Sequence, residues 1–415
     1  MDAATVGKIF INQIEHDFRV AIIKKDKKGY NLDPSQLLSL KIGNTIQDQW
    51  LYVEAIYIDR GLGTISNYTA DASMLLNIKI KNESLRVPVD IELNFVVDLI
   101  AMIDSKSGEP TYKITGSHVL TNALQQQIRV FFENEEPTNM LKQIISEAKG
   151  EIELKIDSNH TSAIKTSYIS DIDMPLTSHI ERLCNMASGE KLGAFFISID
   201  LLSGYLKSFS TRVDRTPGKD NKIRIFKLSG ANNITLSDEF SNIFDWQEIN
   251  GNFPAEMARD LFSSKVFVRF DHVKRKWISS EYTIKKLNTI FTNKEMDYKF
   301  IYNPPDWEER LGIVKDEYYA TDDSLLGYKI RVATTRSSML YGKVRCDLGI
   351  GVGSFIIIDG GTETLTKKYG GLWLISGVRH VIERQVAVTE MTLTRAFVID
   401  DSGMGKTSKN AGMNK

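Results

Sequence analysis

The chain has 415 residues, of which 42% are hydrophobic and 25% charged, and its 52 basic and 53 acidic side chains leave a net charge of −1. This length exceeds one ordinary hydrophobic core and predicts two to four domains. The near-zero charge excludes a global attraction to nucleic acid or to an anionic membrane. No apolar run reaches the roughly 18 residues of a membrane span, since Asp200 interrupts the best candidate, and the N-terminal residues lack the features of a signal peptide.

Residues 1–120 consist almost wholly of strand signals. The runs either alternate polar and apolar residues or are apolar throughout, and clusters rich in Gly, Lys and Ser separate them. This spacing, without intervening helices, predicts an antiparallel β-barrel or sandwich. The six predicted strands are 18–23, 37–42, 50–59, 75–81, 87–100 and 112–120.

Residues 121–210 predict a small α+β domain. A helix over 137–148 begins at Pro137, a residue that suits the first turn, and a second helix over 176–188 follows Pro175. Cys184 lies on the apolar stripe of that second helix, so we expect a small core residue rather than a nucleophile. The run 193–209 predicts a hairpin. Cys184 and the chain's other cysteine, Cys346, have no neighbours at metal-binding spacing and predict free, buried thiols of a reducing compartment.

The stretch 211–320 is the least regular. Residues 211–264 predict a loop-rich linking segment in which 223–228 resembles a strand, 265–275 contain a strand, and 276–340 form an insertion ending in a helix over 322–340. The basic cluster 274–276 predicts a solvated turn rather than a phosphate site. The last residues, 401–415, are rich in Gly, Ser, Lys and Asn and predict a disordered tail.

The region 370–398 predicts a long antiparallel hairpin. Two runs rich in β-branched and aromatic residues, 372–382 and 386–397, flank the polar trio 383–385. Strict alternation predicts one face with Leu372, Leu374, Val378 and Ile382, and another with Trp373, Ile375 and Val381 beside Arg379 and Glu383. A strand apolar on both faces is buried twice, once in a core and once against something else. The alternative is a central strand of one large sandwich.

The sequence contains no catalytic constellation. The glycine-rich run 349–353 precedes a strand, whereas a dinucleotide-binding loop follows a strand and opens a helix, so it predicts a kinked entry into a β-strand. The six histidines are scattered, and the carboxylates form no legible pair. We therefore expect no enzyme activity, no cofactor and no metal site.

The order of these elements resembles the baseplate hub proteins of contractile-tailed phages and, more distantly, the spike proteins of type VI secretion. The segments 130–148, 172–200 and 322–359 match in order, and the most specific residues are 372–375, 378–382 and 391–395. Residues 211–320 match nothing in the family.

The resemblance implies a mainly β chain with α+β insertions, in which two tail-tube-like antiparallel β-barrels are joined by smaller α+β domains. The first barrel is expected over residues 1–120. The second is expected to be split, with 265–275 joining 341–400 and the intervening residues inserted outward. The second burial of the closing hairpin is then expected against the neighbouring barrel or the tube ring above.

The resemblance also implies a structural hub, a homotrimeric pseudo-sixfold ring that connects the tail tube to the central spike in the virion's tail baseplate and is assembled in the host cytoplasm. The expected partners are further copies of the chain, a tail tube or tube-initiator protein, the spike protein, baseplate wedge or tape-measure proteins, and DNA that passes without specific binding. The residues expected at the assembly interface are Trp373, Ile375, Arg379, His380, Val381, Met391, Leu393 and Arg395.

Two alternatives stay open. The chain fits equally a hub or spike component of a type VI or phage-like secretion machine. A tail-associated cell-wall hydrolase or an adhesin is the other alternative. The hydrolase would need a pair of carboxylates across a cleft, and an adhesin is expected to carry more repeats and exposed aromatic residues.

Overall fold

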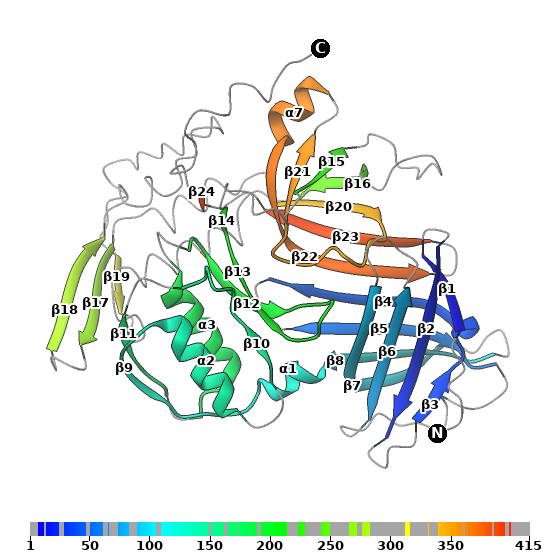
Figure 1. The fold of residues 1–415 in the computed structure, drawn as a ribbon, viewed down its shortest axis with the longest axis horizontal. Helices are drawn as coiled ribbons and strands as arrows, with labels where there is room; N and C mark the ends of the chain where they lie inside the picture. The colour runs from blue at the N-terminus through cyan, green and yellow to red at the C-terminus, as the bar shows by residue number, and fades with distance from the viewer. Residues whose placement is uncertain are drawn as a thin grey trace.

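The protein was analysed as a computed structural model, which is dominated by β-strands (Figure 1). No helix among the residues described is both long enough and apolar enough to cross a membrane. The structure describes residues 7–11, 14–24, 29–46, 50–60, 65, 74–82, 89–104, 109–148, 152–161, 165–171, 173–188, 192–213, 223–228, 242–249, 265–271, 276–282, 312–315, 331, 339–359, 362–383, 386–394 and 398–399.

The first β-domain is a curled antiparallel sheet of six main strands in the order β2-β6-β7-β8-β5-β4. Its inward positions alternate with outward ones, as in β5, where every second residue is buried. Two short strands extend the β2 side, and a 3-10 turn leads into β4. The elements are β1 (Gly7–Ile11), β2 (Ile14–Ile23), β3 (Gly29–Leu32), η1 (Pro34–Gln36), β4 (Leu37–Thr45), β5 (Leu51–Ile58), β6 (Leu75–Asn82), β7 (Val89–Asp104) and β8 (Thr111–His118).

The α+β region follows directly. The two predicted helices and the predicted hairpin of β12 and β13 are present. The two longer helices pack against each other, and the second also packs against β12. Cys184 is fully buried in that helix, so its predicted core position is confirmed. The elements are α1 (Val119–Ala123), β9 (Phe131–Glu135), α2 (Pro137–Glu147), β10 (Leu154–Lys155), β11 (Thr166–Ile169), α3 (Leu176–Ala187), β12 (Phe195–Ile199) and β13 (Leu206–Ser210).

The second β-domain is a closed barrel. Its strands pair in the cyclic order β22-β21-β15-β16-β20-β23, and β23 returns to β22. A short helix joins β21 to β22, and the core is centred on the fully buried Trp373. The elements are β15 (Arg224–Leu228), β16 (Asn242–Glu248), β20 (Met339–Arg345), β21 (Phe355–Asp359), α7 (Glu363–Tyr369), β22 (Gly371–Glu383) and β23 (Ala387–Thr394); a separate two-stranded pair is formed by β14 (Arg212–Val213) and β24 (Val398–Ile399).

The predicted composition of this barrel is wrong in one respect. The strand expected from 265–275, β17 (Lys265–Asp271), lies in a separate sheet between β18 (Lys276–Tyr282) and β19 (Gly312–Lys315). The nearby β18 supplies its antiparallel partner at little loop-closure cost. The barrel instead takes β15 and β16 from the segment 211–264, for which a loop-rich link is predicted.

Two other expectations fall mainly or wholly beyond the described residues. The predicted helix 322–340 is described only at Arg331, which is helical, and at Met339 and Leu340, which belong to β20 and not to a helix. The predicted disordered tail, 401–415, lies outside the described residues.

Five strands of the two domains correspond one to one. The antiparallel order β4-β5-β8-β7-β6 of the first domain has the same connectivity as β16-β20-β23-β22-β21 of the second. The correspondence ends at the sixth strand, because β2 is antiparallel to β6 whereas β15 is parallel to β21. The chain therefore contains one five-strand unit twice.

Candidate assembly interface

The two β-domains are joined by backbone pairing into one continuous sheet. The second half of β22, from Gly377 to Glu383, pairs antiparallel with β4, while β23 runs along its other side (Figure 1). The first half of β22 pairs with β21 instead. The change of partner coincides with a bulge at Ser376, whose carbonyl oxygen accepts a hydrogen bond from the Ile46 amide at 2.8 Å. We call the β4–β22 pairing the seam.

The bulge also changes which side chains share a face. Strict alternation predicts Ile375 and Val378 on opposite faces, but both belong to the core of the second barrel, because the extra residue shifts the phase of the strand. Further along, Ile382 packs in the core of the first domain. The predicted double burial of this strand is therefore made within one chain, between its two β-domains.

The solvent-facing side of the seam is polar and paired. Arg379 forms an ion pair with Glu390 on β23, and Lys343 on β20 bonds Asp245 at 2.5 Å. Opposite Arg379 on β4 lies Gly43, and a Cβ there would stand 2.8 Å from the hydroxyl oxygen of Tyr52. Because Gly43 has no side chain, the Tyr52 ring has room beside the Arg379 guanidinium. Side chains of both β-domains therefore cover this face of the seam.

The inward side of the seam holds a buried histidine. His380 is 1% exposed, and its Nδ1 lies 2.9 Å from the hydroxyl of Thr389. That hydroxyl also accepts a hydrogen bond from the Asp347 amide at 3.0 Å. Burial lowers the pKa of His380 from 6.5 to about 4 although Asp347 acts to raise it. The ring is therefore neutral at physiological pH.

The α+β region is anchored at the end of the same seam. The Asn44 amide donates to the carbonyl oxygen of Ile199 at 2.8 Å, and the Ser198 hydroxyl donates to the carbonyl oxygen of Thr45 at 3.0 Å. Both bonds join β4 to β12. A buried polar group without a partner costs about 1–3 kcal/mol. Any other arrangement of the two β-domains and the α+β region would break these bonds, so they stabilise the observed one.

The structure places most of the predicted interface residues inside the chain. Trp373, Ile375, Met391 and Leu393 are at most 2% exposed in the core of the second barrel. These side chains are already covered within the chain. Of the remaining four, His380 and Val381 are buried at the seam, Arg379 is solvent-facing, and Arg395 lies outside the described residues.

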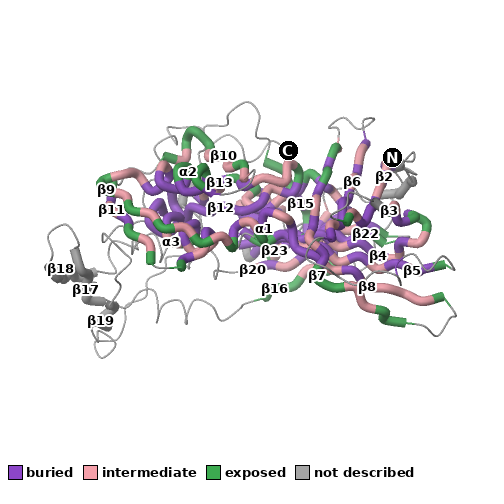
Figure 2. The backbone as a smooth tube through the Cα atoms, turned by 90° about the horizontal axis from the view of Figure 1, so that it is seen from below, coloured by how far each residue is buried: buried purple, intermediate pink, exposed green. Residues whose placement is uncertain are grey.

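A group of exposed apolar residues was not anticipated. The sequence predicts a strand ending at residue 100, but β7 continues to Asp104. The C-terminal end of this strand is exposed (Figure 2), and its exposed apolar residues are Leu99, Met102 and Ile103. The apolar run itself gave the only available signal. Nothing in the local pattern distinguishes a strand covered by its own chain from one left at an edge.

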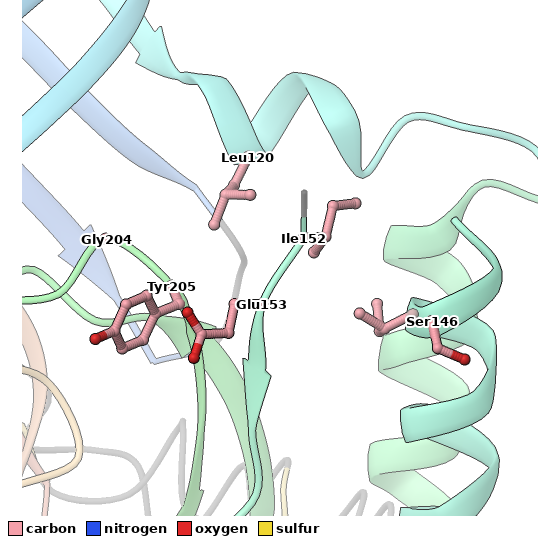
Figure 3. Close-up of a pocket in the computed structure, with 7 residues that line it drawn as sticks. Leu120, Ser146, Ile152, Glu153, Gly204 and Tyr205 are labelled. Atoms are coloured by element: carbon pink, nitrogen blue, oxygen red, sulfur yellow. The ribbon is translucent and has the colours of Figure 1, made fainter. Parts of the chain in front are cut away.

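One open pocket of about 410 Å³ lies where the first β-domain meets the α+β region (Figure 3). Leu120 on α1, Ile152 and Ile145 give it apolar walls, and Tyr205 of the β12–β13 turn is another of its lining residues. Its one carboxylate, Glu153, is paired with Lys155 at 3.3 Å. Its lining presents no nucleophile beside a base, and the described residues contain no cluster of three potential metal ligands.

No family model matches the sequence, and no curated protein matches it either. Similar folds exist among solved structures. A tail protein from Neisseria meningitidis MC58 superimposes with a TM-score of 0.57 at 10% identity, covering 92% of this chain and 99% of that one. The 43 kDa tail protein of prophage MuSo2 from Shewanella oneidensis gives 0.53 at 11% identity, covering 91% and 98%. The chain therefore shares the fold of phage tail proteins over nearly its full length.

Proposed function

We propose that the chain is the structural hub of a phage tail baseplate, a homotrimeric ring that connects the sixfold tail tube to the threefold central spike. The observation that carries the proposal is the duplicated five-strand unit joined by the seam. Two equivalent units per chain, repeated three times about an axis, present six positions to the tube and three chains to the spike.

The fold shared with two tail proteins supports the same proposal, since it covers both β-domains together rather than one barrel. We assign the chain to the virion tail, with the tube or its initiator, the spike, and the wedge or tape-measure proteins as partners. A scaffolding role also agrees with the pocket, whose one carboxylate is held by a lysine.

DNA that crosses such a ring must not adhere to it. Proteins that hold DNA do so by neutralising phosphates with unpaired lysine and arginine. Beside the seam, on the solvent-facing side of the joined sheet, three described cations are paired: Lys41 and Lys113 share Glu54, and Arg379 is held by Glu390. We propose that this side lines the bore.

Native mass spectrometry of the purified chain, over a concentration series that includes micromolar protein, tests the hub proposal. The expected species is three times the mass of one chain. A chain that stays monomeric and well folded across the series contradicts the ring, and a dimer or tetramer contradicts the threefold match to a spike.

A further inference from the structure

The exposed end of β7 is an unpaired sheet edge. β6 pairs with β7 from Val89 to Val96, and beyond Val97 no strand of the described chain pairs with that side. The side chains along this edge are apolar, with Leu99 47%, Met102 58% and Ile103 51% exposed. A long apolar edge normally invites pairing with another strand, so a natural protein that keeps one usually covers it in an assembly.

The matching strand of the second barrel shows how such an edge is covered. β22 corresponds to β7, and in both strands the pairing with the preceding strand ends at the same position. The Val97 amide donates to the Met74 carbonyl at 3.0 Å, and the Ile375 amide donates to the Ser354 carbonyl at 2.9 Å. A bulge follows immediately in each strand. After its bulge β22 pairs with β4 on this side, whereas on the same side of β7 no described strand pairs after the bulge, and β8 occupies only the other side.

Among the described strands, β16, which corresponds to β4, lacks a partner along part of one side. β16 pairs with β20 as β4 pairs with β5, but β15 reaches its other side only at Asn242 and Ile243. No described strand pairs with that side further along. At its end Ile249 is 43% exposed, so this edge also carries apolar surface.

We propose that β7 of one copy pairs antiparallel with β16 of the next copy, repeating between chains the seam that β22 and β4 make within one chain. The proposal rests on the hub function, because it supplies the contact that closes the ring. The strand that covers the β7 edge belongs to a second copy of this chain, since the internal seam already has the same pairing between the corresponding strands.

The correspondence fixes a register. Thr115 and Thr392 occupy the same place, because they lie opposite Leu99 and Gly377. In the first domain, Thr115 lies opposite Glu54 on β5, which lies opposite Lys41 on β4. In the second domain, Thr392 lies opposite Tyr341 on β20, which lies opposite Gln247 on β16.

Lys41 therefore corresponds to Gln247, and two residues further on Gly43 corresponds to Ile249. In the same way Arg379 corresponds to Ala101. The internal pair of Arg379 and Gly43 thus becomes Ala101 opposite Ile249 between copies. In the internal pair the large residue is on β22 and the small one on β4. In the pair between copies the small residue is on β7 and the large one follows β16.

Such pairing joins two different surfaces of the chain, so it cannot make a symmetric dimer. It builds a ring if the rotation between copies closes and a filament if it does not, and the hub function requires the ring. Each β-domain then has a seam on both sides, and three internal seams alternate with three between copies. Six equivalent units follow from a single kind of strand pairing.

Disulfide cross-linking tests the register. Directly opposite residues of an antiparallel pair lie about 4.5–5.5 Å apart at Cα, within the reach of a disulfide. Ala101→Cys combined with Ile249→Cys is expected to yield covalent dimers and trimers, ending at the closed trimer, on non-reducing gels. Each single variant is expected to give none. The control pair Ala101→Cys with Ile225→Cys, which uses an exposed β15 position away from the contact, is also expected to give none.

A second comparison uses charge. Met102→Lys is expected to weaken the ring's association at least tenfold, while Ile225→Lys, at the same 58% exposure, leaves it unchanged. Both side chains are exposed, so both variants should fold. A native trimer that forms no Ala101–Ile249 cross-link and tolerates Met102→Lys overturns this pairing while leaving the hub proposal intact. A wild-type chain that is monomeric throughout overturns both, and cross-links that run on past the trimer overturn the closed ring.

Discussion

Acidification should weaken the seam through His380, and the size of the effect follows from its burial. The pKa of this histidine is lowered from 6.5 to about 4, so the folded protein binds the proton less readily than the unfolded chain. The neutral ring therefore contributes stability that is complete above pH 6.5 and is lost as the pH falls toward 4. One pKa unit corresponds to 1.36 kcal/mol, so the full loss is about 3 kcal/mol, with about 2 kcal/mol already gone at pH 5.

Denaturant unfolding at pH 7.5 and pH 5.0 measures this loss. The variant His380→Gln retains a polar group beside the Thr389 hydroxyl but does not titrate, so its stability should fall by about 2 kcal/mol less than that of the wild type. His118, whose pKa burial also lowers to about 4, provides the matched control at the junction of β8 and α1. His118→Gln should reduce the loss of unfolding free energy between pH 7.5 and pH 5.0 by a similar amount. The double variant should reduce it by the sum of the two amounts. An unchanged pH dependence in His380→Gln would refute the assignment of a neutral, desolvated ring.

Three further outcomes follow from individual side chains. Leu393→Asp places a charge in the fully buried core of the second barrel and should abolish soluble protein at a cost of several kcal/mol, whereas Val386→Asp, at a position 48% exposed, should be neutral; soluble, assembled Leu393→Asp particles would show that the hairpin is misread. Gly353→Ala should lower the unfolding free energy by more than 1 kcal/mol, because the residue has φ +80° and an added Cβ would lie 2.1 Å from the Phe209 ring; equal denaturation midpoints would contradict this. Wild-type ring should not bind double-stranded DNA at physiological salt, and Glu390→Gln, which frees an arginine, should raise binding measured by fluorescence anisotropy while costing at most about 1 kcal/mol of stability; strong salt-dependent binding by the wild type would refute the paired bore.

The sequence was most informative where a pattern is local. The strands of the first domain, the helices beginning at Pro137 and Leu176, and the doubly apolar hairpin around Trp373 all follow from periodicity and from start signals. The bulge at Ser376 could not be predicted, because one inserted residue leaves an apolar run looking the same while it exchanges the two faces.

Pairings between distant segments were beyond local reasoning. The run 223–228 resembles a strand from its residues alone, but β15 is only five residues long and its partner β21 is a parallel strand more than a hundred positions away. The local pattern therefore does not assign β15 to the barrel. The buried residues Met391 and Leu393 were expected at a contact between chains for a related reason. Apolar spacing shows that a side chain is covered, but it does not show whether the cover belongs to the same chain or to another.

An electron cryo-microscopy reconstruction of the purified particle, without imposed symmetry, shows whether three copies with two equivalent units each build a pseudo-sixfold ring. We expect a closed ring of six barrel-sized lobes around a central bore, with three repeats of a two-lobed chain and a strand pair joining every neighbouring lobe. A ring of any other lobe number, or adjacent chains that meet away from β7 and β16 and leave those edges exposed, would contradict it.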